Sequence, residues 1–343
     1  MRLHHRKPSF APCKSDAAVD ACVTICVMQT PRYHALGDNI VCIDALYTAP
    51  GMACCYLIGS AGEYALIETG TARSIDNILA TLAALGVELS QLRYVIPTHV
   101  HLDHAGAACQ LMAMAPGATL LIHPRGARHM IDPARLVASS IAVYGEAVFA
   151  KLYGEILPIS ESRVRTLGDG ESVQLGARTL RVLHTRGHAE HHFCLYDELS
   201  ESWFTGDMFG ISYPALRFDG GSLLLPATTP TQFDPQLYIA SVEALAAAHP
   251  RNCYLTHFSA LPFEARQVEM LRRQLLAYAE LGDTNHSTEF VVDSILALAE
   301  AEARALTDAA SAAAAVAALK MDMALNAQGI LWWRDRQRAG ALS

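Results

Sequence analysis

Apolar residues near the start of the chain occur first in short runs and then at helical spacing. Pro-Gly and Ala-Gly pairs separate the runs. Apolar runs bounded by such turn residues predict consecutive antiparallel strands, here at residues 39–47, 53–59 and 64–69. Residues 75–85 then place apolar side chains on one face of a helix, with Ser74 as the N-cap and Gly86 at the end.

The middle of the chain mixes further strands with helices. A buried strand ends at Ile96, and the small residues from Ala105 onward predict the start of a helix. Helical spacing returns at residues 133–157 and 235–248, whereas residues 208–225 lack a period and predict a loop with a short hairpin. Short apolar runs predict a strand at 119–122, hairpin strands at 164–167, 172–175 and 179–184, a strand at 202–205 and the last strand at 253–256.

Beyond residue 260 the pattern is almost wholly helical. Ala- and Leu-rich segments predict helices at residues 262–281, 287–307 and 309–325. We therefore expect a core domain at residues 28–260 and a helical extension at residues 261–343. Packing against the core, a substrate lid and a homodimer interface are the alternative roles of this extension.

Composition and charge narrow the class of protein. The chain has 343 residues, a net charge of −8 and nine cysteines, with no Cys-x-x-Cys pair. The acidic balance argues against a nucleic-acid partner, and no apolar run reaches the ~18 residues that a membrane span needs. Reduced thiols predict a cytoplasmic protein. Acidic residues interrupt the apolar stretch within residues 1–27, which predicts a disordered extension rather than a signal peptide.

Metal-ligand residues are concentrated directly after the strand that ends at Ile96. His99, His101, Asp103 and His104 lie within six positions. Side chains alternate in an extended segment, so we expect His99, His101 and Asp103 to converge, with His104 turned to a neighbouring direction. Imidazole and carboxylate groups suit zinc or iron. Two neighbouring groups of ligands suit two metal ions better than one.

This His-x-His-x-Asp-His motif resembles the signature of the metallo-β-lactamase fold superfamily. The resemblance implies further ligands in Gly-His, Thr-Gly-Asp and strand-His contexts, and His188, Asp207 and His257 occur in those contexts. It covers residues 37–260 and implies an α/β fold, the αββα sandwich of the family, followed by the helical extension. It also implies that His99, His101 and His188 hold one divalent ion and that Asp103, His104 and His257 hold a second, with Asp207 between the two.

The reaction that the resemblance implies is hydrolysis of an ester-like bond in a small molecule. A hydroxide bridging two ions, zinc in the first place and iron as the other choice, would attack a thioester, a lactone or a related bond. Asp103 would steer a proton to the leaving group. Glyoxalase II-like thioesterases and lactonases share the full ligand set, whereas a β-lactamase proper lacks the bridging Asp. The alternative function is an iron-dependent oxidoreductase that handles oxygen or a persulfide.

Several other residues are weaker candidates for the site. Tyr213 is a candidate donor to a developing oxyanion, although related lactonases carry their catalytic Tyr nearer the bridging Asp. Glu68 is either an acceptor for a ligand histidine or a solvated turn acid. One of His191 and His192 is expected to support the site, with a structural role as the stronger alternative for each. His123 is expected to be structural.

Overall fold

The computed structural model describes residues 30–228 and 230–341. The chain divides into Met1–Thr30 and Pro31–Ser343, and all helices and strands described below lie in the second unit. The extension predicted at residues 1–27 lies outside the described residues.

One sheet has seven strands in the described part of the chain, in the order in which they occur in the sequence. These are β1 (Tyr33–Gly37), β2 (Ile40–Asp44), β3 (Cys54–Ser60), β4 (Glu63–Ile67), β5 (Leu92–Ile96), β6 (Thr119–Ile122) and β7 (Val164–Thr166). The first four strands pair antiparallel, and β4 to β7 pair in parallel. The prediction that residues 164–167 belong to a hairpin is therefore wrong. These residues form β7, which pairs in parallel with β6, and the helices between the two strands form the crossover that a parallel pair requires.

The second sheet has six strands within the described residues, in the order β15-β14-β11-β10-β9-β8. They are β8 (Ser172–Leu175), β9 (Arg178–Thr185), β10 (His192–Asp197), β11 (Ser202–Gly206), β14 (Asn252–Leu255) and β15 (Ser259–Pro262). A separate hairpin joins β12 (Arg217–Phe218) to β13 (Gly221–Ser222), as predicted for the loop at 208–225. The strand predicted as the last is followed by β15, which pairs antiparallel with it, so the expected boundary at residue 260 falls inside a strand.

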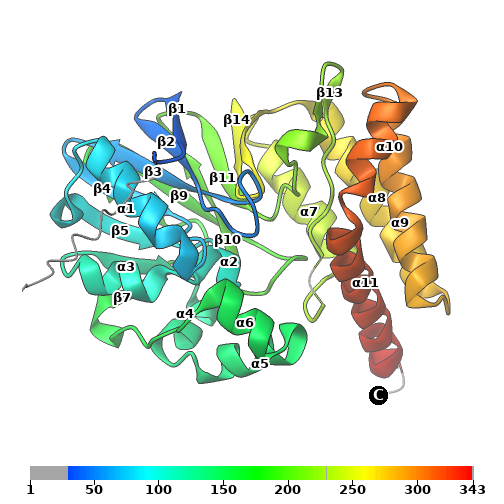
Figure 1. The fold of residues 1–343 in the computed structure, drawn as a ribbon, viewed down its shortest axis with the longest axis horizontal. Coiled ribbons are helices and arrows are strands. Elements are labelled where there is room, and N and C mark those ends of the chain that lie inside the picture. The colour runs from blue at the N-terminus through cyan, green and yellow to red at the C-terminus, as the bar shows by residue number, and fades with distance from the viewer. Residues whose placement is uncertain (1–29, 229, 342–343) are drawn as a thin grey trace, which may run out of the picture. The chain divides into compact units, whose positions relative to one another are not determined.

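Helices cover the outer faces of the two sheets, which pack against each other (Figure 1). Aromatic rings fill the space between the sheets, where Tyr56 lies 5.2 Å from Phe204 and 5.5 Å from Tyr254 between ring centroids. Helices α1 (Ile75–Ala84) and α3 (Ala108–Met114) cover the first sheet, and α7 (Pro235–Ala246) covers the second. This arrangement confirms the predicted αββα sandwich.

The C-terminal helices share one apolar core with α7 and the second sheet. They are α8 (Ala265–Asp283), α9 (Thr288–Arg304), α10 (Ala309–Ala317) and α11 (Lys320–Ala341). Leu271 of α8 and Ile295 of α9 are buried in the same cluster as Leu255 of β14. The third predicted helix instead consists of two helices, and α11 continues to residue 341 because Trp333 packs against Gly282.

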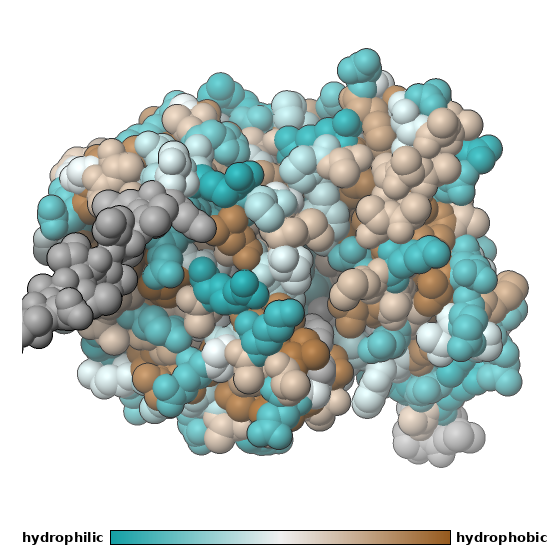
Figure 2. Space-filling view, viewed as in Figure 1, coloured by the Kyte–Doolittle hydropathy of each residue, from teal (hydrophilic) through white to brown (hydrophobic). Residues whose placement is uncertain are grey.

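Of the five α-helices described between β5 and β7, four border the candidate ligands or their pocket. They are α2 (Leu102–Ala105), α4 (Pro124–Ile131), α5 (Ala134–Tyr144) and α6 (Glu146–Tyr153). The helix predicted at 133–157 is broken at Gly145, whose φ of 80° lies in the left-handed region. Figure 2 shows apolar side chains over α5 and α6, where Val143 and Val148 are exposed.

No single helix among the described residues is long and apolar enough to cross a membrane. The pair α5 and α6, bent by 118° at the break between them, passes the same test only when the two are taken together.

Candidate metal centre

The candidate ligands follow the carboxyl ends of strands that meet at one edge of the two sheets. In the first sheet β4 and β5 run parallel, and in the second sheet β9 and β11 share a direction with β14. Parallel strands end at the same sheet edge. The residues delivered there are Glu68 after β4, His99 to His104 after β5, His188 after β9, Asp207 after β11 and His257 after β14.

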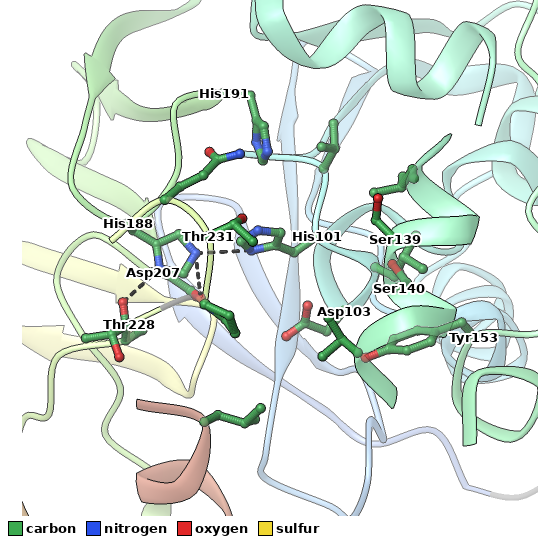
Figure 3. A pocket seen from close by; sticks show the side chains of 18 of the residues that line it. His101, Asp103, Ser139, Ser140, Tyr153, His188, His191, Asp207, Thr228 and Thr231 are labelled. Carbon is green, nitrogen blue, oxygen red and sulfur yellow. Dashed lines mark hydrogen bonds and ion pairs between the residues drawn. The ribbon is translucent and has the colours of Figure 1, made fainter. Parts of the chain in front are cut away.

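The first ligand group consists of His99, His101 and His188. The Nε2 atom of His99 lies 2.7 Å from Nδ1 of His101 and 3.2 Å from Nε2 of His188. The distance between His188 Nε2 and His101 Nδ1 is also 3.2 Å. Figure 3 shows His101 and His188 turned toward each other, as the sequence predicted for this group.

The second group consists of Asp103, His104 and His257, whose potential ligand atoms lie within 4.8 Å of one another. Asp207 lies between the two groups. Its Oδ2 atom is 3.4 Å from Nε2 of His188, and its Oδ1 atom is 3.3 Å from Nε2 of His104 and 3.5 Å from Nε2 of His257. The structure therefore brings all seven predicted ligands together, with the Asp207 carboxylate between the two groups.

The local backbone differs from the expectation for Asp103. His101 is the extended N-cap of α2, and Asp103 and His104 lie on that helix. Asp103 therefore does not converge with His99 and His101, as it would in an extended segment. The helical turn directs Asp103 and His104 toward His257 and separates the two groups.

Hydrogen bonds fix the protonation of the ligand histidines. The Nδ1 atoms of four of them face oxygen atoms: Thr98 Oγ1 for His99, Glu68 for His104, the carbonyl of Ala227 for His188 and the carbonyl of Met52 for His257. Thr98 Oγ1 donates its own proton to Glu68, so it accepts from His99. Each Nδ1 therefore carries the proton, and each Nε2 lone pair points toward the centre.

These lone pairs and the carboxylates fit metal ions. Among the described residues, the buried atoms His104 Nε2 and Asp207 Oδ1 have no hydrogen-bond partner. The Nε2 atoms of His99 and His188, both without a proton, face each other at 3.2 Å and would repel without a cation between them. Imidazole and carboxylate donors with protonated Nδ1 atoms bonded to outer acceptors are the ligand chemistry of zinc and iron sites.

The electrostatics of the centre keep the imidazole of His101 neutral and the carboxylate of Asp103 ionised, and they favour a proton on His257 that a metal ion would replace. Burial, together with His188, lowers the pKa of His101 to about 3, so this imidazole is neutral. Burial opposes ionisation of Asp103, yet neighbouring histidines lower its pKa to about 2. Burial also disfavours the charged form of His257, but the carboxylates of Asp207 and Asp103 outweigh it and raise its pKa to about 9. The second group thus attracts positive charge, which a metal ion supplies in place of a proton.

Glu68 is a buried acceptor that orients the ligands, rather than a solvated turn acid. Its carboxylate accepts hydrogen bonds from His104 Nδ1, from the amide and hydroxyl of Thr98 and from the hydroxyl of Thr256. The side chain is 1% exposed, and its backbone has a φ of 64°. Through these contacts Glu68 links the ends of β4, β5 and β14 beneath the ligands.

The turn that carries Asp207 depends on close backbone packing. Gly206 has a φ of 52°, and a Cβ atom there would lie 2.5 Å from Thr98 Oγ1 and from His192 Nε2. His192 accepts a hydrogen bond from the Asp207 amide at 3.3 Å, and Tyr238 donates to the Asp207 carbonyl at 2.5 Å. His192 is thus the member of the His191–His192 pair that supports a ligand, whereas His191 lines the adjacent pocket. His123 has the expected structural role, because its Nδ1 accepts the Arg125 amide at the start of α4.

Five of the candidate ligands form the floor of a pocket of about 410 Å³: His101, Asp103, His188, Asp207 and His257. Side chains from α4, α5 and α6 form one part of its wall. Another part comes from α11 together with Ile211, Tyr213 and residues 227–228 and 230–232. Tyr213 lies in this wall with its ring 6.2 Å from that of His257. Its hydroxyl donates to Asp322 of α11 at 2.8 Å, and this bond competes with the predicted donation to an oxyanion. Burial and then Asp322 raise the pKa of Tyr213 well above its usual value, so the phenol is neutral.

Helix α11 also contacts the segment that holds a metal ligand. The Asn326 side chain accepts from the Thr228 amide at 2.9 Å and donates to the Pro226 carbonyl at 2.9 Å. The intervening Ala227 carbonyl binds His188 Nδ1 at 2.8 Å. The sequence analysis missed Asp322 and Asn326. Their only local signal is that they are polar residues spaced four apart on an otherwise apolar helix segment.

Comparison with known proteins identifies the family. Residues 48–257 match the sequence profile of the metallo-beta-lactamase superfamily. A metallo-beta-lactamase fold-containing protein, ST1585 of Sulfurisphaera tokodaii, is 24% identical over 212 residues, which are 61% of this chain and 73% of that protein. Its crystal structure aligns over 79% of this chain and 98% of that chain, with a TM-score of 0.57 and 21% identity.

Other relatives carry names that include an activity. A probable metallo-hydrolase of Burkholderia pseudomallei is 30% identical over 195 residues, 55% of this chain and 57% of that protein. The acyl-coenzyme A thioesterase MBLAC2 of Bos taurus is 26% identical over 190 residues, 51% of this chain and 65% of that protein. The chain thus spans less than two thirds of the length of these two relatives. The profile match covers more than half of the chain and contains all seven ligands, so the chain belongs to the metallo-beta-lactamase superfamily.

Proposed function

We propose that the chain hydrolyses an ester-like bond, a thioester or a lactone, in a small molecule with the help of two divalent metal ions. One observation carries this proposal: Asp207 lies between two groups of candidate ligands, within 3.5 Å of His188, His104 and His257, at a pocket of about 410 Å³. A pocket of this volume suits a small organic substrate rather than a polymer.

The residues that would hold the ions are the two groups described above. His99, His101 and His188 would hold one ion, and Asp103, His104 and His257 would hold the other, with Asp207 shared. When bound, such ions lower the pKa of water to about 7 and polarise a carbonyl oxygen. Zinc suits these donors, and iron suits them as well.

Asp103 is the carboxylate placed to handle the proton of the reaction. Its side chain is 20% exposed and lines the pocket, whereas that of Asp207 is 8% exposed. An ionised carboxylate at the pocket floor can accept a proton and pass it to the leaving group. Tyr213 and Asp322 form the wall beside His257, and their hydrogen bond fixes the position of the phenol.

The apolar part of the wall favours an acyl substrate. Leu102, Leu136 and Val143 line the pocket, and Tyr47 and Tyr153 close it through a contact of 3.0 Å between their hydroxyl groups. Apolar walls bind the hydrocarbon part of an ester and exclude bulk water from the reacting bond. The similarity to an acyl-coenzyme A thioesterase supports the same class of substrate.

Hydrolysis of a matched substrate panel tests the proposal. Protein stripped of metal and then reloaded with zinc would be assayed on short-chain thioesters, lactones and phosphodiesters. We expect hydrolysis of a thioester or a lactone that requires the metal and is lost in D207A. Failure of the protein with two zinc ions to cleave any of them would contradict the proposal. Oxygen consumption by iron-loaded protein would favour the oxidoreductase instead.

A further inference from the structure

We propose that Arg128 and Arg135 form an anion-binding subsite in the pocket and select esters that carry a carboxylate or phosphate group away from the reacting bond. This inference rests on the proposed hydrolase function and adds a substrate class to it. Both arginines line the pocket, Arg128 in the last turn of α4 and Arg135 in the first turn of α5.

The two guanidinium groups have no carboxylate partner. Within residues 30–228 and 230–341, no Asp or Glu oxygen lies within 4.0 Å of either one. Arg128 donates a hydrogen bond to the imidazole of His129, at 3.3 Å between Nε and Nε2. Burial and then Arg128 and Arg135 lower the pKa of His129, so both positive charges lie close enough to act on it. A cationic cluster without a counter-ion therefore borders the pocket.

Other arginines of the chain show how its guanidinium groups are usually engaged. Arg163 donates to backbone carbonyl oxygens, and Arg273 pairs with Glu302 at 2.9 Å. Arg125, on the same helix as Arg128, pairs with Glu190. The chain as a whole has a net charge of −8, so unpaired positive charge facing its pocket is a local feature and not a consequence of composition.

One small molecule could contact both the cationic cluster and the metal centre. The ring of His191 lies 5.5 Å from that of His101 and 6.2 Å from that of His129, between centroids. A single imidazole therefore separates a metal ligand from the residue that Arg128 contacts. Figure 3 shows His191 pointing into the pocket next to His101 and His188.

The negative charges of the pocket lie elsewhere. Asp103 and Asp207 belong to the metal centre, and Asp322 of α11 accepts the Tyr213 hydroxyl. Figure 3 shows the α11 segment and Ser139 of α5 on different sides of the pocket. A substrate anion would thus be repelled from the α11 side and attracted to the α4–α5 side, which would orient the ester over the floor.

A set of thioesters that differ in one charged group tests the subsite. One neutral probe is the butanoyl thioester of N-acetylcysteamine. The succinyl thioester of the same thiol adds a carboxylate to the acyl part. Butanoyl phosphopantetheine has a phosphate in the leaving part and is compared with butanoyl pantetheine, which lacks only the phosphate. We expect kcat/KM for one of the charged probes to exceed that for its neutral counterpart at least tenfold, mainly through KM. The preference should decrease as salt is added.

Variants assign the preference to the two arginines. In R128A/R135A the charged and neutral probes should react with similar kcat/KM, because the loss of the two guanidinium groups removes the advantage of the charged probe. Lys151→Ala is the matched control, because it removes one positive charge from the exposed surface of the neighbouring α6 without lining the pocket. It should keep the full preference. Both arginines are exposed, so the double variant is expected to fold, and its melting temperature checks this.

Binding of non-hydrolysable thioethers separates this inference from the hydrolase proposal. Calorimetry would compare the thioether analogues of the four probes on wild type and on R128A/R135A. A charged thioether that binds at least tenfold more tightly to wild type than to the double variant supports the subsite, even if no ester is hydrolysed and the hydrolase proposal fails. Equal affinities for charged and neutral thioethers, or hydrolysis without a charge preference, would overturn the subsite.

Discussion

The floor and the wall of the pocket are built in different ways. On the floor, ligands follow strand ends, are mostly buried and have an outer hydrogen-bond partner, as Glu68 shows for His104. The wall comes from helices, and side chains such as Arg128 and Arg135 are exposed and have no carboxylate partner in the described chain. Side chains that bind metal ions and react with the substrate need fixed positions, which the strand ends provide. Exposed side chains on the helices can differ without disturbing those positions, so they can determine which substrate binds.

The two regions meet at Ala227. Its carbonyl binds the ligand His188, while Asn326 of α11 holds the residues on either side of it. The C-terminal helices therefore contribute to the site in addition to packing against the second sheet. Changes on the floor should abolish metal-dependent chemistry, whereas changes in the wall should alter binding or metal affinity by smaller factors.

The largest effect is expected from Asp207→Ala. Loss of the carboxylate shared by the two ligand groups should reduce metal content below two ions per chain and reduce hydrolysis at least about a thousandfold. Elemental analysis and kcat/KM check both results. Asp76→Ala, which removes an exposed acid from α1, is the control and should behave as wild type. Full activity in D207A would show that the shared position is not needed.

A smaller effect is expected from Glu68→Gln. The amide cannot accept all of the hydrogen bonds that Glu68 receives from Thr98, His104 and Thr256. Loss of such an outer partner typically weakens metal affinity by about 10- to 100-fold. Competition with a chromophoric chelator measures this change, and Glu63→Gln on the surface is the control. Unchanged affinity in E68Q would mean that Glu68 only stabilises the fold.

Asn326→Ala, a change in the wall, should also weaken metal binding at the floor. It leaves the Thr228 amide and the Pro226 carbonyl without their partner, so the free energy of unfolding should fall by about 2 kcal/mol. Because the Ala227 carbonyl lies between them, metal affinity should also fall, by less than about tenfold. Asn285→Ala, an exposed site, is the control. A loss of stability with unchanged metal affinity would show that the two regions are independent.

Tyr213→Phe should have the smallest effect on catalysis. The hydroxyl proton is engaged by Asp322, so kcat should change by no more than about threefold, whereas loss of an oxyanion donor costs about 100- to 1000-fold. Tyr33→Phe, at a partly exposed tyrosine, serves as the control. A large fall in kcat for Y213F with unchanged KM would restore the predicted oxyanion role and show that the bond to Asp322 exchanges during turnover.

The metal centre could be predicted because its signals are local in the sequence. His99, His188, Asp207 and His257 each follow a strand that the apolar pattern reveals, and the αββα order follows from the resemblance. The separation of Asp103 from His99 was implied by the resemblance but not by side-chain alternation, because it depends on where α2 begins. Strand β1 was missed because it is short and largely exposed, so it has no apolar alternation.

The wall could not be predicted because its contacts are tertiary. Asp322 and Asn326 reach Tyr213 and Thr228 from about a hundred residues further along the chain, and helical periodicity cannot specify such pairs. The helix predicted from the sequence ends at residue 325, four residues before Gly329. In the structure a Cβ atom at Gly329 would lie 2.8 Å from Thr228 Oγ1, so this glycine permits close packing inside α11.

The number of metal ions per chain tests the central claim most directly. Elemental analysis of protein purified without added metal, repeated on D207A and D76A, would count them. The account predicts two zinc ions in wild type and in D76A, and fewer than two in D207A. A single ion in wild type, unchanged by the loss of Asp207, would contradict a centre built from two groups of ligands around that carboxylate.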